Sequence, residues 1–280
     1  METLTKISTG IFPVDFNLKI MKKSIFITLI FVSCLFFSQE KKIEIDYVFS
    51  KKMSKKDSSK ITQLYKLIIK DNISYYVSDN KIKEDSIRKN TKRNGINNVV
   101  GNINLSLLNL EEIITYDKSK NLLSSYKYIL ENQFFYNEDG INNWEILKDE
   151  KRINDDLVLN FAKLEFGGRI WYAWYCKEYP ISEGPYKFKN LPGLVFEIYD
   201  SEKIFEITLS KIKNKTVDYT PNFSGFTITT KQKYIEVNRN YFENPAPQIS
   251  KIFTKESQSK LRRNGIERHK NSYYLEKDFE

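Results

Sequence analysis

Residues 168–195 read GRIWYAWYCKEYPISEGPYKFKNLPGLV, and this stretch decides the fold of the chain. Its first part, residues 169–175, predicts a β-strand because aromatic and β-branched residues favour extended backbone. Successive side chains of a strand point to opposite faces. One face would carry Ile170, Tyr172 and Trp174, and the other would carry Arg169, Trp171, Ala173 and Tyr175. Since both faces are largely apolar, we expect the strand to be covered on both sides.

Two turns and two further strands follow in the same stretch. Gly184 and Pro185 redirect the chain, because glycine accepts backbone angles that other residues resist and proline fixes its own φ. Residues 186–189 alternate Tyr-Lys-Phe-Lys and predict a short strand with one apolar and one basic face. Residues 191–194, Leu-Pro-Gly-Leu, place proline and glycine at the second and third positions of a type II turn, where the third needs a positive φ.

The turn leads into a predicted β-meander. Residues 194–199 would place Leu194, Phe196 and Ile198 on one face of a strand, and residues 204–209 form the next strand. With the strand at 186–189 before the turn, these runs predict a β-meander in the core.

The segment resembles the signature of the GLPGLI family, exported proteins of the Bacteroidetes group whose biochemical role is uncharacterised. The resemblance covers about residues 162–200. It rests on a structural motif made of Gly168, Gly184, Pro185, Asn190, Leu191, Pro192, Gly193 and Leu194. Three positions depart from the family pattern. Cys176 replaces a threonine, Asn190 replaces the first glycine of the name-giving motif, and Val195 replaces its final isoleucine. Asparagine tolerates positive φ and valine keeps β-branching, so the turn is expected to survive.

The rest of the chain also reads as short strands separated by polar turns. Candidate strands lie at 43–49, 64–69, 73–77, 99–108, 122–130, 134–136 and 144–147. The predicted fold class is mainly β, an antiparallel sheet in the form of an open half-barrel or a sandwich, with few short helices, one of them at 249–261. Residues 39–280 would form a single β-rich domain. Residues 78–98 predict a mobile loop, and the charged C-terminus is predicted to be loose.

The N-terminal region predicts export. Met21-Lys22-Lys23 precedes an uncharged, mostly apolar run at 24–37, so residues 21–38 are interpreted as a signal peptide. The run is shorter than the roughly 20 residues that a spanning helix needs. Residues 1–20 do not resemble a signal, and we interpret them as a start-site artefact. Lipidation at Cys34 is the alternative. The expected location is the periplasm or the outer membrane, or the protein is secreted.

Composition narrows the classes of function. The chain has 280 residues and a formal net charge of +9, and loss of residues 1–38 removes four lysines and two carboxylates, leaving +7. We interpret the scattered lysines as solvated surface, with anionic lipid headgroups as the open alternative and no nucleic-acid partner. Cys176 would be the only thiol of the mature protein and His269 is the only histidine, so we predict no disulfide, no metal site and no cofactor.

The aromatic strand supplies the candidate binding residues Arg169, Trp171, Trp174 and Tyr175. A guanidinium group can stack on an aromatic ring or bind an anion, although a buried pair of Arg169 with Glu165 or Glu183 would explain it equally well. A glycosidase-like pair would need two carboxylates facing one cleft about 5–10 Å apart. The available groups, each explained more simply as a surface charge, are Glu165, Glu178, Glu183, Glu197 and Asp200. We predict no catalytic residue.

These features predict a non-enzymatic envelope protein that binds a ligand or an outer-membrane partner. The resemblance implies that a transport receptor is one such partner. The first alternative is a periplasmic carrier of lipid or acyl chains with a half-barrel fold, and the second is a hydrolase that uses a carboxylate pair. A large apolar cavity would favour the carrier. A filled core with aromatic side chains on an exposed flank would favour partner binding, and in neither case is an integral membrane protein expected.

Overall fold

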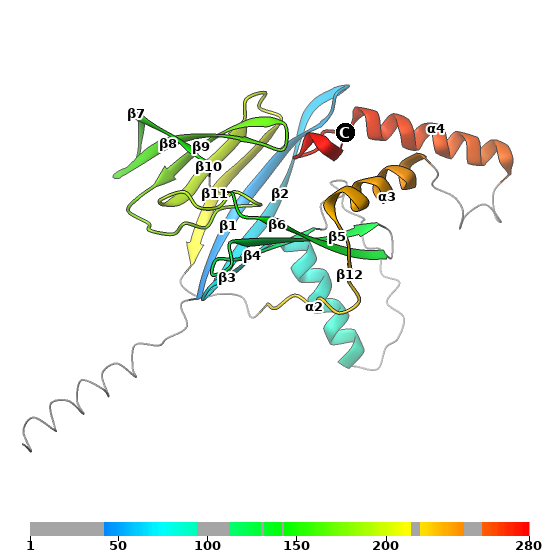
Figure 1. The fold of residues 1–280 in the computed structure, drawn as a ribbon, viewed down its shortest axis with the longest axis horizontal. Coiled ribbons are helices and arrows are strands. Elements are labelled where there is room, and N and C mark those ends of the chain that lie inside the picture. The colour runs from blue at the N-terminus through cyan, green and yellow to red at the C-terminus, as the bar shows by residue number, and fades with distance from the viewer. Residues whose placement is uncertain are drawn as a thin grey trace, which may run out of the picture. The chain divides into compact units, whose positions relative to one another are not determined.

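The described strands of the computed structural model form one open sheet in the order β12-β6-β5-β4-β3-β2-β1-β11-β10-β9-β8-β7 (Figure 1). The structure describes residues 42–93, 112–129, 132–141, 143–213, 219–243 and 254–279. Neighbouring strands are antiparallel except β12 and β6, which are parallel. The predicted mainly β class with an antiparallel, open sheet and few short helices is confirmed.

The elements have the following bounds. The strands are β1 (Lys42–Ser54), β2 (Asp57–Lys70), β3 (Ile73–Ser78), β4 (Ile113–Asp117), β5 (Leu122–Ile129), β6 (Asn132–Asp139), β7 (Glu145–Asn154), β8 (Leu157–Phe166), β9 (Arg169–Cys176), β10 (Leu194–Asp200), β11 (Phe205–Lys213) and β12 (Thr227–Ile228). The helices are α2 (Asp79–Arg93), α3 (Lys231–Glu243), α4 (Lys255–Asn271) and the short η1 (Lys277–Phe279). The predicted strand at 99–108 lies outside the described residues.

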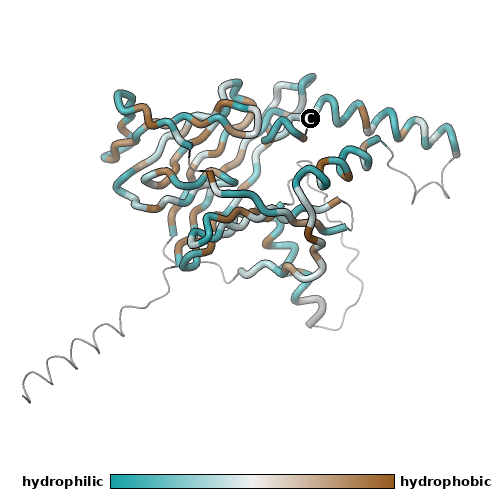
Figure 2. Tube along the Cα trace, in the orientation of Figure 1, coloured by the Kyte–Doolittle hydropathy of each residue, from teal (hydrophilic) through white to brown (hydrophobic). Residues whose placement is uncertain are grey.

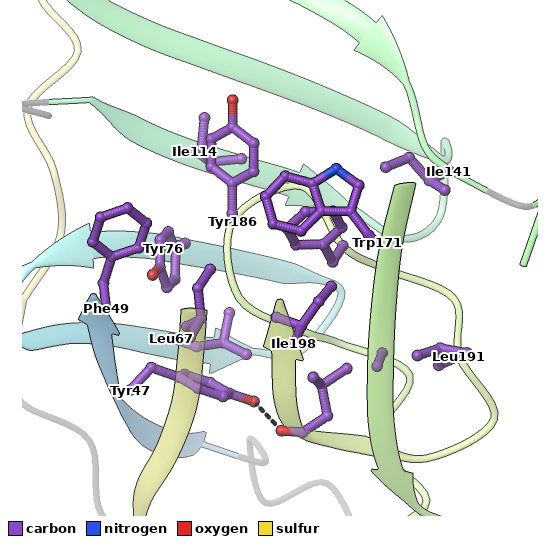
Figure 3. Packing of buried hydrophobic residues seen from close by; sticks show 14 of the residues in the cluster. Tyr47, Phe49, Leu67, Tyr76, Ile114, Ile141, Trp171, Tyr186, Leu191 and Ile198 are labelled. Atoms are coloured by element: carbon purple, nitrogen blue, oxygen red, sulfur yellow. Dashed lines mark hydrogen bonds between the residues drawn. The ribbon is translucent and has the colours of Figure 1, made fainter. Parts of the chain in front are cut away.

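The main core lies on one face of this sheet, here called the inner face. Alternate residues of β1, such as Tyr47 and Phe49, point to it, and so do Leu67 of β2, Trp171 of β9 and Ile198 of β10 (Figure 3). The Tyr47 hydroxyl donates a 2.8 Å hydrogen bond to the Val195 carbonyl, so a buried polar group on β1 is satisfied by β10. The two halves of the sheet therefore share one apolar interior.

Residues 183–191, here called the inner segment, lie within this core without forming a strand. The predicted two-faced strand at 186–189 is wrong, because Lys187 and Lys189 are 0% and 1% exposed, as deeply buried as Phe188 between them. The Phe188 ring packs 4.7 Å from the ring of Trp171. The Trp144 indole donates a 2.8 Å hydrogen bond to the Lys189 carbonyl. Alternation failed as a guide here because both ammonium groups find partners inside the protein.

The turn before β10 differs from the predicted type II geometry. Gly193 does not have a positive φ, whereas Asn190 does, at 68°. The Asn190 side chain is held by the Ile141 carbonyl at 2.7 Å and by the Tyr116 hydroxyl at 3.0 Å, which offsets the strain of the left-handed conformation. Gly193 is required for a different reason. A Cβ atom there would lie 2.2 Å from the Cys176 carbonyl oxygen of β9.

A β-bulge in β10 changes which residues face the core. The β9–β10 register shifts between Val195 and Glu197, so Val195 pairs with Tyr175 and Ile198 pairs with Ala173. The prediction that Leu194, Phe196 and Ile198 share one face is therefore wrong, because Phe196 is the extra residue. The antiparallel pairing of the predicted strands at 194–199 and 204–209 is confirmed, as β10 and β11. On its other edge β10 pairs with β9, and not with the predicted strand at 186–189.

Helix α2 replaces most of the predicted mobile loop at 78–98. The Ser78 hydroxyl accepts a 3.1 Å hydrogen bond from the Lys81 amide, which caps the first turn. Pairs spaced by four residues, including Lys81 with Asp85 at 2.8 Å, support the helix along its length. The apolar contact between α2 and the sheet is made by Ile82, which packs against Ile68 and Val77 on the outer face.

The C-terminal end is ordered rather than loose. Glu276 is 0% exposed, and Leu275 and Phe279 are also buried. The helix predicted at 249–261 begins at Lys255 within the described chain, because the Thr254 side chain caps it by accepting a hydrogen bond from the Ser257 amide. Residues 249–253 lie outside the described residues. None of the described helices combines the length and the apolar character needed to cross a bilayer.

Replacing Gly193 with alanine should lower the free energy of unfolding by about 1–3 kcal/mol, because the new Cβ would force β9 and the turn apart. Pro192→Ala is the matched control, since Pro192 is exposed and should tolerate the change within about 0.5 kcal/mol. Urea denaturation monitored by tryptophan fluorescence measures both. Equal midpoints for the two variants would contradict this account of the turn.

Candidate functional site

The outer surface of β8, β9 and β10 carries a group of aromatic side chains, here called the aromatic face, made of Phe161, Tyr172, Trp174 and Tyr199. Cross-strand pairing brings them together, since Phe161 pairs with Trp174 and Tyr172 pairs with Tyr199. The rings of Phe161 and Tyr172 are parallel with centroids 5.6 Å apart, and those of Phe161 and Trp174 are 4.3 Å apart. Tyr172, Trp174 and Tyr199 remain half-exposed.

Charged groups border the aromatic face. The Arg152 guanidinium lies 4.8 Å from the Trp174 ring and pairs with Glu197 at 2.6 Å. The Lys203 ammonium lies over the ring of Tyr199. An aromatic centre with a charged rim is the composition that proteins use at binding surfaces. The arrangement can therefore hold a partner with both apolar and polar groups.

The four predicted binding residues are divided between the two faces of β9. Trp174 lies on the aromatic face, whereas Arg169, Trp171 and Tyr175 point into the core and are 5%, 0% and 0% exposed. The Trp171 indole donates a 3.1 Å hydrogen bond to the Phe166 carbonyl, and burial raises the pKa of Tyr175. The structure thus brings three of them together as packing residues and separates Trp174 from them.

Arg169 is a buried pairing residue, but not with Glu165 or Glu183. Its guanidinium lies 3.5 Å from the Asp200 carboxylate and donates a 3.0 Å hydrogen bond to the Tyr274 carbonyl. Asp200 in turn accepts 2.8 Å hydrogen bonds from the amides of Ile204 and Phe205. The pair therefore fixes the turn between β10 and β11 and ties it to the C-terminal end.

The candidate catalytic carboxylates have separate partners. Glu183 is buried and accepts a 2.8 Å hydrogen bond from the Ser74 hydroxyl, whereas Asp200 serves the turn described above. Glu197 pairs with Arg152, and Glu165 and Glu178 are exposed. Each group has a structural or surface role in this arrangement.

The inner segment places two lysines in the core. The Lys189 ammonium donates a 2.6 Å hydrogen bond to the Gly184 carbonyl and lies 3.6 Å from Glu183. Complete burial lowers the pKa of Lys189, although the Glu183 carboxylate opposes that effect. Sequence analysis missed both buried lysines, since alternation with Tyr186 and Phe188 indicated a solvated basic face.

Lys187 belongs to an ionic cluster formed with Lys231, Glu138, Glu276 and Asp278. Its ammonium contacts Glu138 and lies 2.7 Å from Glu276. Lys231 of α3 lies 2.5 Å from Glu276 and 2.8 Å from Asp278. The Tyr186 hydroxyl also donates to Glu276, at 2.5 Å. Glu276 is thus the shared acceptor of three donors, and no pattern in the sequence connects it with residues some ninety positions earlier.

The charges of this cluster determine the ionisation of Glu276. Burial alone would raise its pKa, but the ammonium groups of Lys187, Lys231 and Lys127 outweigh burial and lower the pKa to about 2. Burial opposes the charged form of Lys187 as well, yet Glu276 and Glu138 raise its pKa. Glu276 and Lys187 therefore stabilise each other's charged form inside the core.

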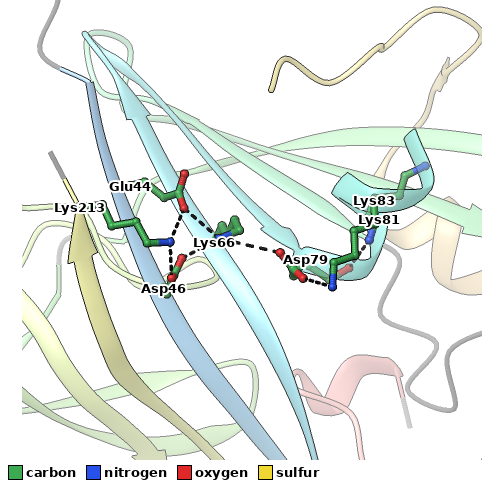
Figure 4. A network of polar contacts seen from close by, with 8 residues as sticks. Glu44, Asp46, Lys66, Asp79, Lys81, Lys83 and Lys213 are labelled. Atoms are coloured by element: carbon green, nitrogen blue, oxygen red, sulfur yellow. Dashed lines mark hydrogen bonds and ion pairs between the residues drawn. The ribbon is translucent and has the colours of Figure 1, made fainter. Parts of the chain in front are cut away.

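A second network lies on the outer face, at the centre of the sheet (Figure 4). Lys66 of β2 contacts Glu44 and Asp46 of β1, both at 2.9 Å, and Lys213 of β11 contacts the same two carboxylates at 2.9 and 2.6 Å. Hydrogen bonds to Asp46 and Glu44 raise the pKa of Lys213. Lys66 also lies 3.9 Å from Asp79 at the start of α2. In the part of the chain that the structure describes, no group of three or more His, Cys, Asp or Glu residues is arranged to hold a metal ion.

Comparisons with known proteins give one family and a weak structural likeness. Residues 137–197 match the family described as a protein of unknown function (Porph_ging), a span that contains β9 and the inner segment. Two solved structures of PNGF-II, in the P21 and C2 space groups, are each 12% identical and have TM-scores of 0.48 and 0.47. The similarity covers 71% of this chain and 33% and 32% of those chains, so this chain spans about a third of their length. No curated protein matches significantly.

Removing the Asp200 side chain should destabilise the protein by about 2–4 kcal/mol, because Asp200→Ala leaves the buried Arg169 and two turn amides without this acceptor. Glu202→Ala is the control, since Glu202 is 58% exposed and lies 3.8 Å from the same guanidinium. Its change should stay within about 0.5 kcal/mol. Thermal and urea unfolding measure both, and equal losses would refute the role given to Asp200.

Because of Glu276, the free energy of unfolding should depend on pH in the acid range. A folded pKa of about 2 against an ordinary 4.5 means that its contribution is complete above pH 4.5 and is lost as pH falls from there through 2. The loss is about 3 kcal/mol, at about 1.4 kcal/mol for each pKa unit. In Glu276→Gln this part of the acid dependence should disappear, whereas the exposed Glu165→Gln should keep it. Unfolding free energies measured from pH 7 to pH 2 test the difference, and identical acid profiles for the two variants would disprove it.

Proposed function

We propose that this chain is an exported, non-enzymatic cell-envelope protein of the GLPGLI type that binds an outer-membrane protein through its aromatic face. The signal-like segment at 21–38 supports export, and the motif around Pro192 and Gly193 supports the family assignment. The match of residues 137–197 to a family of unknown function is consistent with both.

One observation carries the proposal: the inner face of β9 is buried in the core, whereas its outer face stays partly accessible. Its inner face is filled by the core, in which Trp171 packs against Phe188 of the inner segment. Its outer face leaves Tyr172 and Trp174 half-buried beside Tyr199, so both rings keep part of their surface accessible. Tyrosine and tryptophan are enriched among the residues that dominate binding energy at protein interfaces. A filled core with aromatic side chains on an exposed flank therefore supports partner binding.

The same arrangement argues for a non-enzymatic role. The buried carboxylates Glu183, Asp200 and Glu276 are each neutralised by a lysine or an arginine or bound by backbone amides. Groups engaged in this way stabilise the fold and are not poised to transfer protons. For the carrier alternative, the inner segment would have to leave the inner face before lipid could enter.

Site-specific cross-linking tests the proposal. A photoreactive phenylalanine analogue, benzoylphenylalanine, would replace Tyr172 or Trp174 on the aromatic face, with Tyr128 of β5 as a half-buried control position. In cells of the source organism, irradiation should produce one discrete adduct with an outer-membrane protein from positions 172 and 174 but not from 128. Cell fractionation and N-terminal sequencing should place the protein in the envelope, beginning near Gln39.

The other outcomes are equally definite. Lipid attached at position 188 of the inner segment, in a parallel variant, would support the carrier instead. An unprocessed chain in the cytosol would reject export. Equal labelling at positions 172, 174 and 128 would reject the aromatic face as the binding surface.

A further inference from the structure

The last residues of the chain occupy the core as a separate peptide would. Residues 273–279, here called the C-terminal segment, contact the body at several points besides the Glu276 carboxylate, and Leu275 is part of the main core. The Lys277 amide donates a 2.7 Å hydrogen bond to the Gly167 carbonyl, and the Tyr274 carbonyl accepts one of 3.0 Å from Arg169. Phe279 is buried beside Tyr234 of α3, with ring centroids 6.1 Å apart.

The helix that precedes this segment is attached at the surface, mainly to α3, where the His269 ring stacks 4.9 Å from the Phe242 ring. None of the α4 residues is buried, and its side chains are mostly hydrophilic (Figure 2). Its contacts with the body include an exposed pair of Lys56 with Glu267 and a backbone hydrogen bond from Lys55 to Asn271. Exposed ion pairs contribute little to stability. The C-terminal segment is therefore held mainly by its own contacts.

The body provides a site shaped for such a segment. Lys187 and Lys231 converge on the carboxylate of Glu276, at 2.7 and 2.5 Å, and they come from the inner segment and from α3. Gly167 lets the peptide backbone approach closely, because a Cβ atom there would lie 2.9 Å from the Glu276 Cα. The site thus recognises a carboxylate by charge and the adjoining backbone by shape.

Aromatic contacts extend the site on both sides of the carboxylate. Tyr274 stacks near Phe279, with ring centroids 6.5 Å apart, and the Lys127 ammonium lies 4.7 Å from the Phe279 ring. The recognised feature is a glutamate with an aromatic residue two positions before it and another three positions after it. This pattern is specific enough to define a ligand class.

We propose that the C-terminal segment is an exchangeable internal ligand, and that its site binds an acidic, aromatic-flanked peptide of the same chemistry from another chain. The peptide comes from a second copy of this protein, whose residues 273–279 carry the carboxylate and the aromatic residue that the site recognises. An internal ligand competes at high effective concentration, so binding from outside is weak until the internal contacts are loosened.

Hydrogen exchange on the unmodified full chain is the first test. The amides of Lys277 and Phe279 should exchange through local opening, at least tenfold faster than central amides of β9 such as Ala173. Exchange of the three amides at one common rate, set by global unfolding, would overturn the proposal. This measurement does not depend on any variant being folded.

Peptide binding is the second test. The probe is a fluorescent, N-acetylated peptide with the sequence of residues 272–280, and its control carries glutamine at the position of Glu276. The full-length Glu276→Gln variant should bind the probe at least tenfold more tightly than the unmodified chain does. The control peptide should not bind, and the added Lys231→Met change should abolish binding. No binding of the probe to a folded Glu276→Gln chain would also overturn the proposal.

Mixing tests a second copy as the donor. Dimers should appear by light scattering when unmodified chain is added to Glu276→Gln chain, because only the former carries an intact glutamate. A mixture that stays monomeric while the probe binds would reject a second copy as the donor.

Discussion

The two lysines buried in the inner segment are the constraint on which the rest of the structure depends. An ammonium group removed from water must be paired and hydrogen-bonded, or its burial costs several kcal/mol. Lys189 finds Glu183 and the Gly184 carbonyl nearby, whereas Lys187 needs Glu138 of β6 and Glu276 from the end of the chain. The inner segment is therefore most stable within the core when the sheet, α3 and a carboxylate at the position of Glu276 are all in place.

This requirement links distant parts of the sequence. The inner segment reaches β3 through Ser74 and Glu183, and β4 through Tyr116 and Asn190. In the other half of the sheet, on the same inner face, the inner segment packs against β9 through Trp171. A segment that touches both halves of an open sheet replaces the second layer that such a sheet would otherwise need. Burial of Phe188 and Leu191 adds roughly 1.5–3 kcal/mol each to this arrangement.

Strands could be predicted from the sequence where alternation and local partners agree, as in β9 and the β1–β2–β3 meander. Prediction failed where a residue far away in the sequence pairs with a charged side chain and allows it to be buried. Lys187 and Lys189 have the spacing of a solvated face. Pairing with Glu276 and Glu183 offsets the desolvation cost of burying them. Likewise, residues 79–93 contain few apolar side chains, and the helix is held by ion pairs, by the hydrogen bond from the Tyr219 hydroxyl to Asp85 and by the packing of Ile82.

The candidate site, too, could be predicted only in part from local sequence patterns. Period-two alternation separated Trp174 from Arg169, Trp171 and Tyr175, but could not tell which face meets the core, because both carry aromatic residues. The inner segment decides this by covering one side. The contacts that hold the inner segment lie on the inner face, so substitutions at Tyr172 or Trp174 change the aromatic face without breaking them. Any effect of such substitutions on the proposed binding can therefore be separated from an effect on the inner segment.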